Sequence, residues 1–140
     1  SRAPRRLRAR APVTTLDLDL LIRETPRNRQ KLAHFCELLG APHPRRFSDL
    51  SPAESILSTA VPIDILFDRV PPDLTFESLR SRRQWVQVGD ERAAVASLED
   101  IIASKAATGR PKDLAVLPVL RDTLAVIRLR HALPVRPGDE

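Results

Sequence analysis

The chain has 140 residues, of which 42% are hydrophobic and 29% are charged, and its formal net charge is +5. This length suits a single domain with its own hydrophobic core, and no apolar run approaches the roughly 20 residues that a membrane-spanning helix requires. The only cysteine, Cys36, lies among apolar residues and excludes an internal disulfide. We therefore expect a soluble protein of the reducing cytoplasm with a buried thiol.

Residues 1–12 form an arginine-rich arm. They contain five arginines and no acid, so the net positive charge of the chain resides there and the remainder is neutral. We expect an irregular arm, or a short helix that Pro4 interrupts and Pro12 ends. Such an arm could contact nucleic acid or phosphate, although runs of surface charge are more often simply solvated. A single domain is expected over residues 13–133, followed by a frayed tail at 134–140.

Residues 14–22, TTLDLDLLI, alternate as a strand with two unlike faces does. Asp17 and Asp19 lie side by side on one face, opposite a row of leucines. Aspartate disfavours strands and does not stabilise a core, so this pair predicts a site. Neighbours on one face are roughly 7 Å apart at Cα, and two carboxylates at that spacing can bind Mg²⁺. The alternative is the solvent-facing side of an edge strand.

A helix is predicted after this strand. Thr25 fits an N-cap before Pro26, apolar residues then recur at helical spacing, and Gly40 ends the helix. The proline-rich residues 41–53 predict a loop. Two alternatives stay open next: a short strand over 56–58, or a helical turn whose capping box starts at Ser51.

Residues 61–67, VPIDILF, alternate again and predict a second strand. Ile63, Ile65 and Phe67 share one face, and Asp64 lies at the centre of the other. This acid either belongs to the site of the first strand or faces water at a sheet edge. Asp68 is expected only to start a turn.

A short helix and a hairpin follow. The helix is predicted over residues 76–83, and the hairpin pairs 85–88 with 92–96 around Gly89. Because no second exposed aromatic side chain accompanies Trp85, we expect it to pack in the core or the hairpin rather than to stack on a nucleic-acid base.

The last part of the chain predicts two helices. Ser97 caps the first, which ends at Gly109. Pro111 opens the second, in which an apolar stripe begins at Leu114 and Pro118 marks a kink or a restart. The segment GRPKD places three charges at a helix start, where an anion would also meet free backbone N–H groups.

Three stretches together carry a family resemblance: TTLDLDLLI, VPIDILF and VASLEDIIASKAATGRPKDL. With them the chain resembles a nucleotidyltransferase-like domain of the DNA polymerase β superfamily, close to uncharacterised bacterial nucleotidyltransferases and AbiEii-type toxins. The resemblance covers roughly residues 13–124, and the helix that runs into GRPKD is its most specific part. It implies an α+β fold in which helices flank a mixed sheet, and two-metal transfer of a nucleotide from an NTP to an acceptor.

The resemblance also assigns residue roles. Asp17 and Asp19 match the paired Mg²⁺ ligands, and Asp64 matches a third acid, on a neighbouring strand, that helps to activate the attacking hydroxyl. Binding of the nucleotide is assigned to residues on the two last helices, namely Lys105, Arg110, Lys112 and Asp113. One departure is that the glycine-containing element that normally precedes the paired acids is replaced by SRAPRRLRARAPV.

Three functions follow from these observations. The first is a Mg²⁺-dependent nucleotidyltransferase acting on RNA or protein, for example as the toxin of a toxin–antitoxin pair. The second is a catalytically impaired relative that serves as a binding or assembly module. The third is an arginine-armed nucleic-acid binder. The expected partners are an NTP, an RNA or protein acceptor, and an antitoxin or a second copy of the chain, with no membrane.

Overall fold

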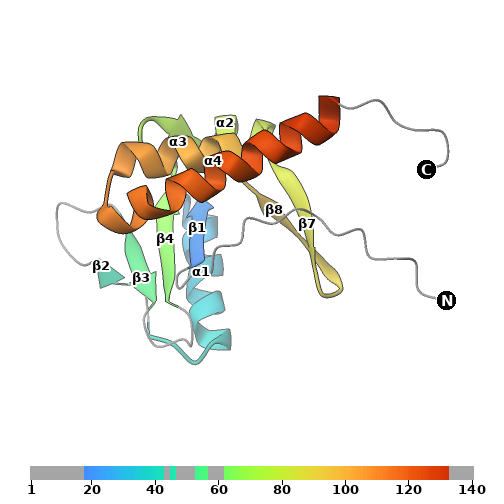
Figure 1. Ribbon diagram of the computed structural model, residues 1–140. Helices are drawn as coiled ribbons and strands as arrows, with labels where there is room; N and C mark the ends of the chain where they lie inside the picture. Colours follow the sequence, from blue (N-terminus) through green and yellow to red (C-terminus); the bar gives the residue numbers. More distant parts are fainter. Residues whose placement is uncertain (1–17, 43–44, 47–52, 57–61, 133–140) are drawn as a thin grey trace.

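The computed structural model describes residues 18–42, 45–46, 53–56 and 62–132. It has the predicted α+β fold, with a small mixed sheet and helices (Figure 1). The arm, the tail and Asp17 lie outside the described residues, so their predictions stay predictions. Among the residues described, no helix is both long and apolar enough to cross a membrane.

The main sheet has four strands in the order β1-β4-β3-β2. β1 is parallel to β4, whereas β3 is antiparallel to both of its neighbours. A parallel pair needs a long crossover, and helix α1 supplies part of it. The strands, in spatial order, are β1 (Leu18–Ile22), β4 (Ile63–Phe67), β3 (Glu54–Ile56) and β2 (Arg45–Arg46).

Helix α1 (Pro26–Leu38) has the ends that its sequence predicts. The Thr25 Oγ1 accepts a hydrogen bond from the Asn28 N–H at 3.1 Å. At the other end Gly40 has a φ of 63°, a left-handed conformation that glycine adopts without steric cost. These signals are local to the segment, which is why the sequence alone was sufficient to predict them.

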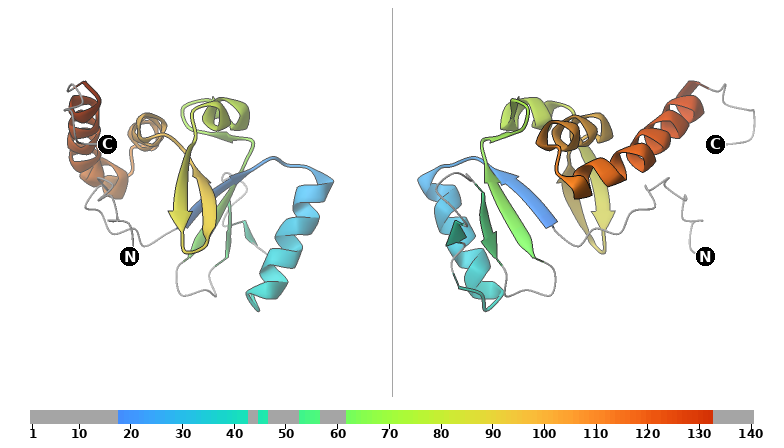
Figure 2. Two further views of the ribbon diagram at one scale, coloured as in Figure 1. Left: turned by 90° about the vertical axis from the view of Figure 1, so that its right-hand side faces the viewer. Right: turned by 60° about the vertical axis from the view of Figure 1, so that its left-hand side comes forward.

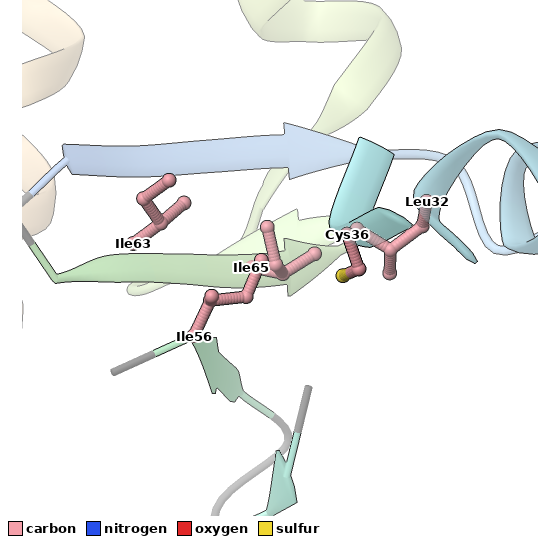
Figure 3. Packing of buried hydrophobic residues seen from close by; sticks show 5 residues of the cluster. All are labelled: Leu32, Cys36, Ile56, Ile63 and Ile65. Atoms are coloured by element: carbon pink, nitrogen blue, oxygen red, sulfur yellow. The ribbon is translucent and has the colours of Figure 1, made fainter. Parts of the chain in front are cut away.

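The hydrophobic core lies between α1 and the sheet (Figure 3). It consists of buried residues from α1, β3 and β4, with Leu20 and Ile22 of β1 packed against them. Burial raises the pKa of the Cys36 thiol, so this cysteine is a small core residue, as predicted. The cluster comprises Leu32, Cys36, Ile56, Ile63 and Ile65.

Two predictions between α1 and β4 need correction. The loop predicted over residues 41–53 contains strand β2, and of the two alternatives that followed it the strand is correct, although it covers Glu54–Ile56. The part of the predicted strand at 57–58 lies outside the described residues. Glu54–Ile56 is a strand because it pairs with β4. The sequence of the segment alone does not show that this partner is present.

The chain then leaves the main sheet. Two short strands, β5 (Arg69–Val70) and β6 (Leu74–Thr75), lead into α2 (Phe76–Ser81). The predicted hairpin is confirmed and forms a separate two-stranded sheet of β7 (Gln84–Val88) and β8 (Glu91–Val95). Trp85 contacts Arg83, which directly precedes β7, and Arg92 of β8, and it remains 46% exposed. Of the two locations predicted for it, the hairpin is therefore correct and the core is not.

Helices α3 (Leu98–Thr108) and α4 (Pro111–Ala132) pack against each other. The cap at Ser97 and the left-handed turn at Gly109 are as predicted, and α4 continues through Pro118 without a restart. The stripe prediction was wrong at its first position, because Leu114 is 50% exposed whereas its neighbour Asp113 is buried. Figure 2 shows α1 on one face of the sheet and these two helices on the opposite side.

Candidate functional site

Two of the predicted acids lie next to each other across neighbouring strands. The parallel register of β1 and β4 pairs Asp19 with Asp64. Paired residues of adjacent strands point to the same face and are about 5 Å apart. This face is opposite the core, because the alternate residues Leu20 and Ile65 pack on the α1 side. Asp19 is exposed and Asp64 is half-buried. Because the two residues point away from α1, they face the side of the sheet on which α3 and α4 lie.

Ser55 extends this row onto a third strand. It is paired with Asp64 in the antiparallel register of β3 and β4, and its hydroxyl donates a 2.5 Å hydrogen bond to Oδ1 of that carboxylate. Ser55 itself is buried. The sequence does not single out Ser55, because a strand is only one of two alternatives for the segment that carries it. A strand assignment would place Ser55 on the face opposite Ile56.

The second half of the site is built around a buried acid at the junction of α3 and α4. Asp113 is only 2% exposed. It accepts a hydrogen bond from Arg110 Nε at 2.7 Å and pairs with Lys105 Nζ at 3.5 Å. The turn at Gly109 brings the end of α3 back to the start of α4, so that both cations reach one carboxylate.

The electrostatics of Asp113 follow from this arrangement. Burial on its own would raise the pKa of the carboxyl group, but the hydrogen bond from Arg110 and the charges of Arg110 and Lys105 outweigh burial. The pKa of Asp113 is therefore lowered, and the group is a carboxylate at neutral pH.

Arg110 connects the two halves. Its pKa is raised mainly by the hydrogen bond to Asp113, against the opposing effect of burial, and further by the charges of Asp113, Asp19 and Asp64. The guanidinium thus lies within electrostatic range of the acid pair on the sheet. Its side chain is 55% exposed, so it remains accessible to a ligand. Lys112, also predicted for nucleotide binding, is exposed on the first turn of α4.

The donor set suits a hard divalent cation only in part. Asp19 and Asp64 offer carboxylate oxygens, which Mg²⁺ prefers. Within the described ranges no three His, Cys, Asp or Glu side chains form a group that could hold a metal ion. Asp17, the third predicted ligand, is not among those residues. Of the three acids predicted to bind the metal ion, the structure therefore describes two, Asp19 and Asp64.

Comparisons with known proteins add no assignment. No protein-family model matches the chain, and a search of curated proteins finds no significant similarity. The functional interpretation therefore depends on the geometry above and on the motif resemblance.

Proposed function

We propose that the chain transfers a nucleotide from an NTP to an acceptor hydroxyl on RNA or protein, with Mg²⁺ as its cofactor. The observation that supports this most strongly is the convergence of three distant segments. The strand register pairs Asp19 with Asp64, and the charges of both acids act on Arg110 at the α3–α4 junction, although long stretches of chain separate the three residues. Acids and cations side by side suit a metal-bound polyphosphate, which needs both kinds of charge.

The proposed reaction assigns a task to each group. The acceptor oxygen attacks the α-phosphorus, the bond from that phosphorus to its bridging oxygen breaks, and pyrophosphate leaves. Asp64, whose Oδ1 is held by Ser55, accepts the proton of the attacking hydroxyl. Arg110 and Lys105, both held by Asp113, stabilise the negative charge of the phosphates.

The carboxylates of the acid pair supply part of a Mg²⁺ site. Asp19 and Asp64 would hold the ion, together with Asp17. When bound, Mg²⁺ neutralises phosphate charge and lowers the pKa of the attacking hydroxyl. The same proposal includes a role as a toxin with an antitoxin partner. Whether the transfer has this role depends on the identity of the acceptor.

The test starts with binding, because binding requires no knowledge of the acceptor. Each of the four NTPs is titrated calorimetrically with Mg²⁺ into the wild type, Asp64→Asn and Asp73→Asn. Asp73 is an exposed acid paired with Arg69, so Asp73→Asn changes net charge equally at a different surface. We expect binding by the wild type and Asp73→Asn, and a loss of at least about tenfold in affinity for Asp64→Asn, because the asparagine keeps the shape but not the charge.

Transfer is then measured with an NTP labelled at the α-phosphate, in the presence of cellular RNA or protein. Label that appears on one of these with the wild type, and is lost with Asp64→Asn, supports the enzyme. Binding of Mg²⁺ and NTP without any transfer favours the binding module instead. No binding of any NTP by the wild type contradicts both.

A further inference from the structure

The β7–β8 hairpin has a surface that the proposed transfer reaction does not use. It forms its own two-stranded sheet, and Figures 1 and 2 place it beyond β1, on the side away from β4. Eight of its ten strand residues are exposed. A two-stranded ribbon on its own contributes little to a core, so most of its side chains lie at the surface.

One face of this ribbon is aromatic and cationic. The register pairs Trp85 with Ala94 and Gln87 with Arg92, so these four side chains share a face. Its strand residues include no acid, because Glu91 is paired with Val88 on the other face. Trp85 is 46% exposed despite its large apolar ring.

Two guanidinium groups contact the indole. The Arg92 Cζ lies 5.0 Å from the ring centroid of Trp85, and the Arg83 Cζ lies 5.1 Å from it. Across the described part of the chain, neither arginine forms a salt bridge with a carboxylate, in contrast to Arg82, which is paired with Asp100 at 2.9 Å. No acid among the described residues therefore neutralises the charges of Arg83 and Arg92.

We propose that this face, defined by Arg83, Trp85 and Arg92, binds single-stranded nucleic acid. This revises the expectation from the sequence that Trp85 does not stack on a base, because the indole is exposed and lies between two arginines. Unpaired bases stack on indole rings and on guanidinium planes, and arginines bind the adjacent phosphates. An acidic peptide would match the charge but would leave the exposed indole without an equivalent partner. The inference does not depend on the proposed transferase activity, since neither the acid pair nor the Asp113 cluster takes part in it.

The chain carries its own probe for this test. Trp85 is the only tryptophan, so a change in intrinsic fluorescence reports on this face alone. A twelve-nucleotide oligouridine RNA and the matching oligothymidine DNA are titrated into the full chain. We expect saturable quenching by at least one of them, with affinity that falls as salt rises, and the pair of titrations shows whether RNA or DNA is preferred.

Variants locate the contact, with affinity measured by anisotropy of the labelled oligonucleotide. Trp85→Ala should weaken binding about 5- to 100-fold, as expected for the loss of one stacked base. Trp85→Phe retains an aromatic ring, so its loss of affinity should be much smaller. Arg92→Gln should weaken binding and lower the slope of log affinity against log salt by about 0.7. The matched control is Arg128→Gln, which removes the same charge from the surface of α4.

Several results would overturn the proposal. Binding that leaves Trp85 fluorescence unchanged would place the nucleic acid elsewhere, for example at residues 1–12. Equal losses of affinity in Arg92→Gln and Arg128→Gln would show that binding depends only on the net charge of the protein. Quenching by a polyglutamate peptide, with none by either oligonucleotide, would identify an acidic protein partner instead.

Discussion

At the scale of single residues, Asp113 is the group on which the charged cluster depends. Its replacement by asparagine leaves Arg110 and Lys105 without their shared carboxylate. Because Asp113 is 2% exposed while its cations reach solvent, we expect Asp113→Asn to lower the free energy of unfolding by about 1–3 kcal/mol. Urea denaturation measures this change.

The control for this variant is Asp73→Asn. The pair of Asp73 with Arg69 is exposed on both sides, with side-chain exposures of 75% and 63%, and such pairs contribute about 0–1 kcal/mol. Equal losses of stability in the two variants would contradict a special role of the buried acid.

The lowered pKa of Asp113 predicts a pH dependence with a definite sign. A carboxyl group whose pKa is lower in the folded state binds its proton more readily when unfolded, so it stabilises the fold above the unfolded pKa of about 4. This contribution is lost as the pH falls towards the folded pKa. The difference in unfolding free energy between the wild type and Asp113→Asn should be constant near neutral pH and should shrink below about pH 4. A difference that grew on acidification would reverse this sign.

At the scale of elements, the turn between α3 and α4 decides whether Lys105 and Arg110 meet at Asp113. Gly109 has a φ of 66°, and a Cβ there would meet nothing closer than the Ala106 carbonyl oxygen at 3.8 Å. The cost of a side chain is therefore conformational and not steric. We expect Gly109→Ala to lower the free energy of unfolding by about 1 kcal/mol.

Gly109→Asn is the graded control, because asparagine tolerates the left-handed conformation better than alanine does. We expect its melting temperature to fall between those of the wild type and Gly109→Ala. If all three proteins melt together, the turn does not require glycine.

The elements also show what the sequence could predict. α1, α3 and the hairpin were predicted because their caps and turn residues lie within or beside them, as at Thr25, Ser97 and Gly89. β2 and β3 could not be predicted firmly because β3 pairs with β4, which follows it in the chain, and β2 pairs with β3. The buried position of Asp113 could not be predicted from helical periodicity, which began the apolar stripe at Leu114, because one of its two partner cations, Lys105, comes from the preceding helix.

At the scale of the whole molecule, the candidate site depends on strand register. The alternation predicted that Asp19 and Asp64 lie on polar faces of two strands, and the family resemblance implied that these strands are neighbours. That the two residues are directly paired comes only from the register. Contact between distant segments comes from topology, here from α1 crossing between β1 and β4. Ser55 was missed for the same reason, since only the sheet brings it to Asp64.

This arrangement predicts how ligands should stabilise the entire fold. The acid pair repels a polyphosphate unless a cation is bound, whereas Arg110 and Lys105 attract it. Mg²⁺ with an NTP should therefore raise the melting temperature more than the sum of the two added separately. A ligand at a hundred times its dissociation constant adds about 2.7 kcal/mol, which corresponds to a shift of several degrees in a domain of this size.

Differential scanning fluorimetry or calorimetry of the wild type, Asp64→Asn and Asp113→Asn separates the contributions to this shift. Asp64→Asn should lose the synergy, because the cation loses a ligand, while retaining any effect of NTP alone. Asp113→Asn should reduce the effect of NTP, because it leaves Arg110 and Lys105 unfixed. An NTP shift that is equally large without Mg²⁺ and unchanged in Asp64→Asn would mean that the cations bind phosphate by themselves, and the carboxylates would then have no part in holding a metal.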